Sequence, residues 1–148
     1  MKIYLDTGSL QRPLDSKVQI RVALESEAVV MIIELCESQK LELISSEPLR
    51  FEQTKNTDPA RREFMQQTLS MATEFVESTE AVKQRALMFM GYGVQLLDAL
   101  HLSSAVEGKA DYFCTTDDRF YKRAKELGLA KAQIVTPLQF LEETQNDT

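Results

Sequence analysis

The chain has 148 residues, of which 43% are hydrophobic and 27% are charged, and its formal net charge is −6. This size and composition predict one globular domain, and the acidic balance argues against binding of nucleic acid through overall charge, although an acidic metal-dependent nuclease stays open. No apolar run reaches the ~18 residues of a membrane span, and no secretory signal pattern precedes the first predicted strand. We therefore expect a cytoplasmic protein without membrane contact.

The first third of the chain alternates between strand and helix patterns. The apolar run over 2–6 predicts a strand, and the turn-rich segment TGSLQRPLD follows it. Apolar residues at helical spacing predict a helix over 18–39, and LELISS predicts a strand over 41–46. PLRFEQTK is typical of a short helix, because Pro48 is tolerated in a first turn.

The middle of the chain is predicted to be helical. Asp58 is a good N-cap, and the apolar spacing after it predicts one helix over 58–76. A second helix is expected from about Thr79 to Gly91, and a third, LLDALHLSSAVEG, is expected to end at Gly108.

Strands and helices alternate again toward the C-terminus. DYFCTT predicts a strand over 111–116, and DDRFYKRAKELG predicts a helix that ends at Gly128. A fourth strand over 133–136 precedes a last short helix from Pro137, and the tail TQNDT over 144–148 is expected to be flexible.

Strands separated by helices predict right-handed crossovers and a mostly parallel sheet with helices on both faces. No linker-like stretch divides the chain, so we expect an α/β domain over 1–143. Cys36 and Cys114 lie far apart in apolar segments, and two cysteines alone make neither a disulfide framework nor a zinc site. Both are expected to be reduced core residues.

Acidic residues follow two of the predicted strands. Asp6 ends the first strand, and Asp117 and Asp118 follow Thr115 and Thr116 at the end of the third. Because ligands gather where the carboxyl ends of parallel strands meet, we expect these carboxylates at one rim of the sheet.

Two further acids are candidates for this rim. Asp98 interrupts an apolar helical face, where a lone carboxylate is costly to desolvate, so it either faces a cation, or caps its helix or stays solvated near the helix N-terminus. Glu47 and Glu52 follow the second strand, and either one is near enough in sequence to reach the rim.

Converging carboxylates need a counter-charge, because each pair within ~4 Å repels by about 4 kcal/mol at an effective dielectric of ~20. Mg²⁺ or Mn²⁺ takes oxygen ligands, activates water and neutralises a phosphodiester. The acids therefore favour phosphodiester hydrolysis. His101, the single histidine, shares a helical face with Asp98, and it either supports the acids or packs in the core.

Four segments resemble the PIN-domain ribonucleases, a family that includes the VapC-like toxins of type II toxin–antitoxin pairs. They are YLDTGSL, ISSEPLRFEQ, LLDALHLSSA and ADYFCTTDDRF, in the family's order and approximate spacing over about residues 2 to 140. The last two are the most specific. The resemblance implies a three-layer α/β/α fold, a Mg²⁺- or Mn²⁺-dependent endoribonuclease site, an RNA substrate, a small antitoxin partner and frequent homodimers.

By this resemblance, four acids hold the metal and orient the attacking water: Asp6, Glu52, Asp98 and Asp117. Glu52 matches the second motif better than Glu47, which is the fallback. Thr116 either hydrogen-bonds the water or a ligand carboxylate, or is simply a β-branched strand residue.

Two positions depart from the family pattern. Gly8 stands where Asn is usual, and Arg119, next to Asp118, stands where a further acid is common. Arg119 either holds a phosphate or lies in solvent with Lys122 and Arg123 on the same helix. These departures leave open an inactive PIN module that binds RNA or a protein, and a metal- or phosphate-binding domain without nuclease activity.

Overall fold

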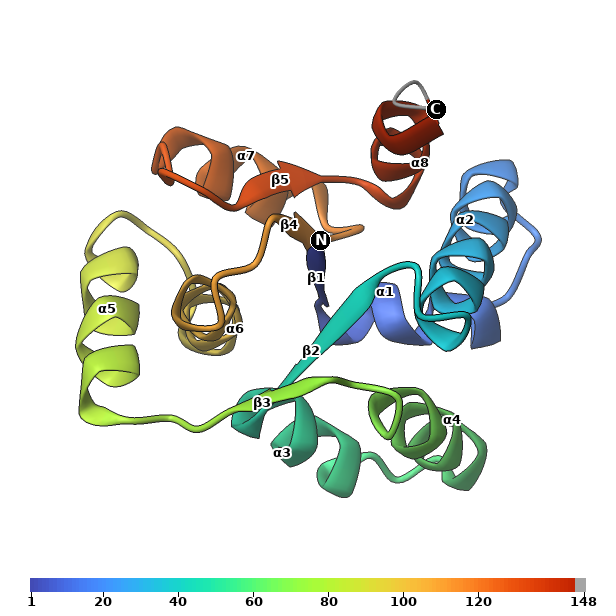
Figure 1. Cartoon of the computed structure of the whole chain (residues 1–148), viewed down its shortest axis with the longest axis horizontal. Coiled ribbons are helices and arrows are strands. Elements are labelled where there is room, and N and C mark those ends of the chain that lie inside the picture. Colours follow the sequence, from blue (N-terminus) through green and yellow to red (C-terminus); the bar gives the residue numbers. More distant parts are fainter. Residues whose placement is uncertain (146–148) are drawn as a thin grey trace.

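The computed structural model describes residues 1–145 of the chain and contains a parallel sheet of five strands in the order β3-β2-β1-β4-β5 (Figure 1). The strands are β1 Lys2–Leu5, β2 Glu42–Ser46, β3 Glu74–Val76, β4 Tyr112–Cys114 and β5 Gln133–Val135. All neighbouring strands run in the same direction. The chain builds the sheet outward from β1 to β3 and then returns to β4 on the other side of β1, as in doubly wound sheets.

Helices cover both faces of the sheet, which confirms the three-layer α/β/α arrangement (Figure 1). The helices are α1 Thr7–Gln11, α2 Ile20–Glu37, α3 Glu47–Lys55, α4 Pro59–Leu69, α5 Glu80–Gly91, α6 Leu96–Glu107, α7 Asp118–Glu126 and α8 Pro137–Gln145, with a 3₁₀ turn at Arg12–Leu14. In Figure 1, α2, α4 and α8 lie to the right of the sheet and α5, α6 and α7 to its left. None of the helices in the described residues is long and apolar enough to cross a membrane.

The centre of the sheet is fully buried, because both faces are covered. The ring of Tyr4 in β1 stacks on Phe113 in β4, with centroids 5.3 Å apart, and Phe113 meets Phe120 of α7 edge to face. Cys36 and Cys114 are buried and free, as the sequence predicts. The core therefore holds the carboxyl ends of β1 and β4 rigidly side by side.

The turn-rich segment after β1 forms the short helix α1 and the 3₁₀ turn. The reason is local. Asp6 adopts an extended conformation and its carboxylate accepts a hydrogen bond from the Ser9 amide, so the residue that ends the strand also caps a helix.

The single helix predicted over 58–76 is wrong. Helix α4 begins after the Asp58 cap, as expected, but ends at Leu69, and residues 74–76 form the edge strand β3. The amide of Thr73 donates to the carbonyl of Leu43 in β2, so pairing with the sheet replaces the last helical turns. The apolar residues of this segment fit either structure, and only the exposed edge of β2 decides between them.

The other predicted elements are confirmed within a few residues of their ends. Helix α5 begins after Thr79, whose hydroxyl caps it, and α6 ends at Gly108. Helix α8 continues to Gln145, and residues 146–148 of the tail predicted to be flexible lie outside the described residues.

Candidate active site

The direction of chain winding changes between β1 and β4, which is where ligands bind in sheets of this kind. Leu5 and Cys114 are paired across these strands, and the Asp6 amide donates to the Cys114 carbonyl at 3.2 Å. Asp6 therefore follows β1, and Asp117 follows β4, at the same rim. Each carboxylate also caps the helix that starts there, because Asp117 accepts from the Phe120 amide at 2.9 Å.

Asp6 is the most buried acid of this rim, with 7% of its surface exposed. Its Oδ1 accepts the Ser9 amide at 3.0 Å, and the Thr115 side chain also hydrogen-bonds to it, while the Ser9 hydroxyl donates to the Cys114 carbonyl at 3.2 Å. Burial raises the pKa of Asp6, and these hydrogen bonds only partly oppose that rise. A buried carboxylate of this kind is stabilised in its charged form by a nearby cation.

Asp98 lies in the first turn of α6, whose N-cap is Gln95. The pKa of Asp98 is raised to about 6, first by burial and then by the negative charges of Asp6, Asp117 and Glu52, which outweigh the opposing effect of His101. Asp98 does not cap its helix, but it does lie partly exposed near the N-terminus of α6, as one alternative expects. After burial, the like charges of the acids from the other elements contribute to its raised pKa.

Glu52 lies on α3, and two hydrogen-bond donors hold its carboxylate at the rim. Its Oε1 accepts a hydrogen bond from the Thr7 hydroxyl at 2.8 Å and a short one from Nε2 of His101. Burial acts to raise the pKa of Glu52, but its interactions with His101 and Thr7 outweigh burial and lower the pKa. Both of these hydrogen bonds go to Oε1.

A chain of hydrogen bonds runs from Glu52 through His101 and Tyr4 to Ser46. Nδ1 of His101 and the Tyr4 hydroxyl are 2.6 Å apart, as are the Tyr4 hydroxyl and Oγ of Ser46. If Nε2 carries the proton donated to Glu52, then Nδ1 accepts from Tyr4 and Tyr4 accepts from Ser46, so every donor is used. His101 is 2% exposed and its ring cannot turn without breaking this chain.

The acids of the rim line one cleft of about 460 Å³. Its lining residues are Asp6, Thr7, Gly8, Glu52, Gln95, Leu96, Leu97, Asp98, His101, Thr116 and Asp117. The four acids assigned by resemblance and two of the accessory residues, Thr116 and His101, therefore surround the same space.

Three other candidates lie outside this cleft. Glu47 is exposed at the start of α3. Asp118 forms a two-pronged ion pair with Arg21 of α2, at 2.7 and 2.8 Å, which lowers the pKa of Asp118. Arg119 lines a separate hollow next to the cleft. Of the acids after β2, only Glu52 thus faces the other three.

Sequence reasoning missed Thr7, Tyr4 and Ser46, which orient Glu52 and His101. Tyr4 gives a weak signal, because its hydroxyl in a fully buried strand needs a polar partner. Thr7 and Ser46 give none, since small hydroxyl residues are common at the ends of strands.

The donor set suits a hard divalent cation, because it consists of carboxylates whose mutual repulsion is visible in the pKa of Asp98. Among the residues that the structure describes, no three His, Cys, Asp or Glu side chains are already gathered closely enough to hold an ion. Ligation therefore requires side-chain rotations, for which the partly exposed Asp98 and the exposed Asp117 have room.

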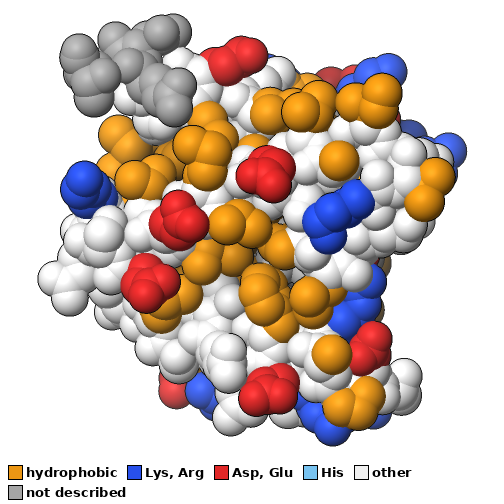
Figure 2. All heavy atoms as spheres, turned by 90° about the vertical axis from the view of Figure 1, so that its right-hand side faces the viewer, with side chains coloured by type: hydrophobic (Ala, Val, Ile, Leu, Met, Phe, Trp, Pro, Cys, Tyr) orange, Lys and Arg blue, Asp and Glu red, His pale blue; other side chains and the backbone are white. Residues whose placement is uncertain are grey.

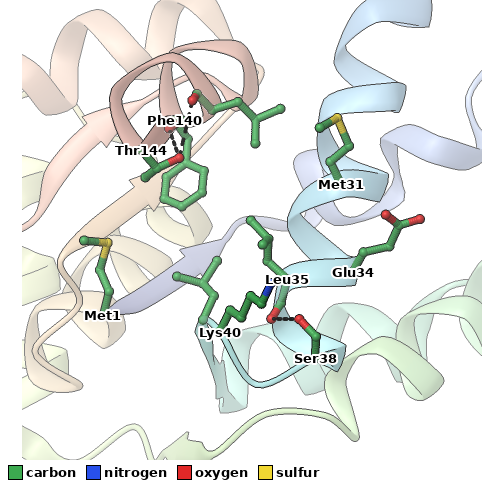
Figure 3. Close-up of a pocket in the computed structure, with 10 residues that line it drawn as sticks. Met1, Met31, Glu34, Leu35, Ser38, Lys40, Phe140 and Thr144 are labelled. Carbon is green, nitrogen blue, oxygen red and sulfur yellow. Dashed lines mark hydrogen bonds between the residues drawn. The ribbon is translucent and has the colours of Figure 1, made fainter. Parts of the chain in front are cut away.

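A larger cavity, of about 690 Å³, lies elsewhere, between α2 and α8. Figure 3 shows Met31 and Leu35 of α2 facing Phe140 of α8, with Met1 nearby, and Figure 2 shows hydrophobic side chains gathered on this side of the molecule. Met1 precedes the start of β1 and Asp6 follows its end, so this cavity is at the opposite end of the strand from the acids. Its lining residues are mainly hydrophobic and include one acid, Glu34, in contrast to the four acids of the cleft.

A solved structure with a similar fold is the crystal structure of VapBC2 from Rickettsia felis bound to a DNA fragment from their promoter. The match has a TM-score of 0.58 and 14% sequence identity, and covers 90% of this chain and 98% of that chain. At this identity the likeness concerns the fold. A search of curated proteins found no match. The family model of the PIN domain matches residues 3–126. The chain therefore belongs to the PIN-domain family.

Proposed function

We propose that the protein is a Mg²⁺- or Mn²⁺-dependent endoribonuclease that hydrolyses RNA phosphodiester bonds. The observation that carries this proposal is the convergence of carboxylates from four different elements on one cleft at the switch point of the sheet. Membership of the PIN-domain family, whose members are generally nucleases, supports it.

In this proposal, Asp6, Glu52, Asp98 and Asp117 would hold the ion. When bound, such an ion neutralises the carboxylates, polarises a phosphodiester and activates water. Asp6 is fixed by its backbone hydrogen bonds, and Glu52 is oriented by Thr7 and His101. Thr116, which also lines the cleft, is near enough to hydrogen-bond a water or a substrate oxygen.

The first test is Mn²⁺ binding by calorimetry together with cleavage of a structured RNA pool. We expect Glu52→Gln to weaken Mn²⁺ binding and to slow cleavage at least about tenfold, because the variant removes a ligand charge. Glu47→Gln is the matched control, since Glu47 lies on the same helix outside the cleft. Equal effects of the two variants, or cleavage that continues in EDTA, would contradict the proposal.

A substitution at Gly8 tests whether cleavage can be increased. A Cβ atom at Gly8 would lie 3.6 Å from Oγ1 of Thr116 and 3.9 Å from Oδ1 of Asp6, both ordinary contacts. We expect Gly8→Asn, which restores the residue usual in the family, to fold normally and to raise cleavage severalfold by adding a polar group beside Asp6. Gly8→Ala, which adds volume without the amide, is the control. If neither variant changes the rate, the missing Asn has no part in the activity.

A binding module without cleavage is the second candidate, and the two departures from the family pattern, Gly8 and Arg119, favour it. An inactive module would bind RNA in the presence of Mn²⁺ without producing fragments, and Asp6→Asn would leave that binding unchanged.

We also propose a toxin role with a small antitoxin partner, because the similar solved structure is a VapBC complex. A homodimer is part of the same proposal. Expression of the chain alone should arrest growth, and Asp6→Asn should relieve the arrest. Growth arrest that persists in this variant would separate toxicity from the acids.

A further inference from the structure

A second hollow adjoins the acidic cleft on the side of α7. Its volume is about 330 Å³, and it is lined by Gly93, Val94, Gln95, Asp98, Asp117, Arg119, Phe120 and Arg123. We call it the arginine hollow. Gln95, Asp98 and Asp117 line both spaces, so the arginine hollow opens directly onto the candidate active site.

The two guanidinium groups of this hollow have no partner within residues 1–145. Among the side chains that the structure describes, neither Arg119 nor Arg123 forms a hydrogen bond or an ion pair. The other arginines contact carboxylates, a backbone carbonyl or an aromatic ring: Arg12, Arg21, Arg50, Arg61, Arg62 and Arg85. Two unpaired cations in a hollow next to the acidic cleft indicate an anion that comes from outside the chain.

Gly93 makes room for one of these cations. Its φ is +94°, which favours glycine, and a Cβ atom there would lie 2.4 Å from Nη1 of Arg123. The guanidinium of Arg123 therefore rests on the backbone of the turn between α5 and α6. This contact keeps Arg123 at the hollow, although the residue itself is exposed.

We propose that Arg119 and Arg123 bind a phosphodiester group of single-stranded RNA, next to the phosphodiester that the acids would cleave. This inference rests on the proposed nuclease function and names how its substrate is held. Guanidinium groups match phosphate oxygens through paired N–H donors. Two spaces that share a wall, one acidic and one basic, suit consecutive phosphates of one strand, with a metal ion at the first and arginines at the second.

The surroundings favour a single strand over a duplex. A net charge of −6 does not favour binding of a double helix through overall charge, whereas two arginines in a hollow suit a local contact. Tyr92, which precedes Gly93, is 68% exposed and offers a ring on which an unpaired base can stack.

The test measures binding of a short labelled single-stranded RNA by fluorescence anisotropy in EDTA, over a range of salt concentrations. We expect the double variant Arg119→Gln, Arg123→Gln to bind about tenfold more weakly. The slope of log K against log salt should also fall by about 0.7 in magnitude, the value for one phosphate contact on a single strand. Arg119→Lys, Arg123→Lys keeps the charges and should retain the slope with an intermediate affinity.

Lys125→Gln is the matched control, because Lys125 lies on the same helix but faces the Tyr121 ring, 5.0 Å away, and lines neither space. The inference is overturned if the double variant binds like the wild type, if Lys125→Gln weakens binding equally, or if the wild type does not bind the RNA.

Cleavage in Mn²⁺, measured on the same samples, separates this inference from the proposed function. Weaker binding by the double variant without cleavage by any form would retain the arginine hollow and overturn the nuclease. If cleavage needs Asp6 but proceeds normally in the double variant, the nuclease function is retained and the role of the arginine hollow is overturned.

Discussion

Replacing Asp98 by Asn should abolish cleavage and yet stabilise the metal-free protein. The pKa of Asp98 is raised to about 6 in the folded chain, so the folded state holds this proton more tightly than the unfolded state. Ionised Asp98 therefore opposes folding above pH 6, and this penalty disappears as the pH falls through 6 toward 4. Asn removes the charge. We expect a gain of about 1 kcal/mol at pH 7, since solvent screens this half-buried group.

Thermal unfolding in EDTA checks this sign, with an expected rise in Tm of about 3 °C for a domain of this size. Excess Mn²⁺ should reverse the ranking, because only the wild type gains about 2.7 kcal/mol at a metal concentration 100 times Kd. Cleavage by the variant should fall at least about a hundredfold. Glu107→Gln, at the other end of α6, is the control and should change neither property much. If Asp98→Asn is less stable than the wild type in EDTA, then burial and the neighbouring acids do not make ionised Asp98 oppose folding.

The same pKa predicts a pH dependence of cleavage. Only the ionised carboxylate ligates a cation, so at low Mn²⁺ the rate should rise through a midpoint near pH 6. Because the cation competes with the proton, higher Mn²⁺ should move the midpoint to lower pH. A rate profile flat between pH 5 and 7 at low Mn²⁺ would exclude Asp98 as a ligand.

His101→Leu should weaken both folding and metal binding. The variant removes the donor to Glu52 and leaves the buried Tyr4 hydroxyl with Ser46 as its remaining hydrogen-bond partner, which costs about 1–3 kcal/mol. Glu52 also loses the contact that fixes Oε1, so Mn²⁺ affinity should fall about tenfold. Calorimetry measures the affinity, and denaturant unfolding measures the stability.

Ser103→Ala provides the matched control for this prediction. Ser103 is buried on the same helix and donates to the Val82 carbonyl at 2.7 Å, away from the cleft. Its loss should cost a similar free energy of unfolding without changing Mn²⁺ affinity. If both variants leave the affinity unchanged, His101 serves only the core, which is the alternative that the sequence leaves open.

Much of the fold is readable from the sequence because its signals are local. The strand before Asp6, the long helix α2 and the Thr79 cap of α5 each depend on neighbouring residues. The convergence of Asp6 and Asp117 follows from chain order alone, because strands alternating with helices form a parallel sheet whose carboxyl ends meet. The family resemblance then supplies the expectation that Asp98 belongs to the same site.

The tertiary structure decided what depends on contacts between distant residues. The strand β3 replaces the end of a predicted helix because the edge of β2 offers it hydrogen bonds. Glu52 rather than Glu47 faces the acids because Thr7 and His101 reach it across two elements. Arg123 lies beside the cleft because Gly93 leaves room for its guanidinium. By itself, the sequence determined which residues carry charge and where strands end. Only packing determined which of those charges share one space, because side-chain contacts over long chain separations have no local pattern.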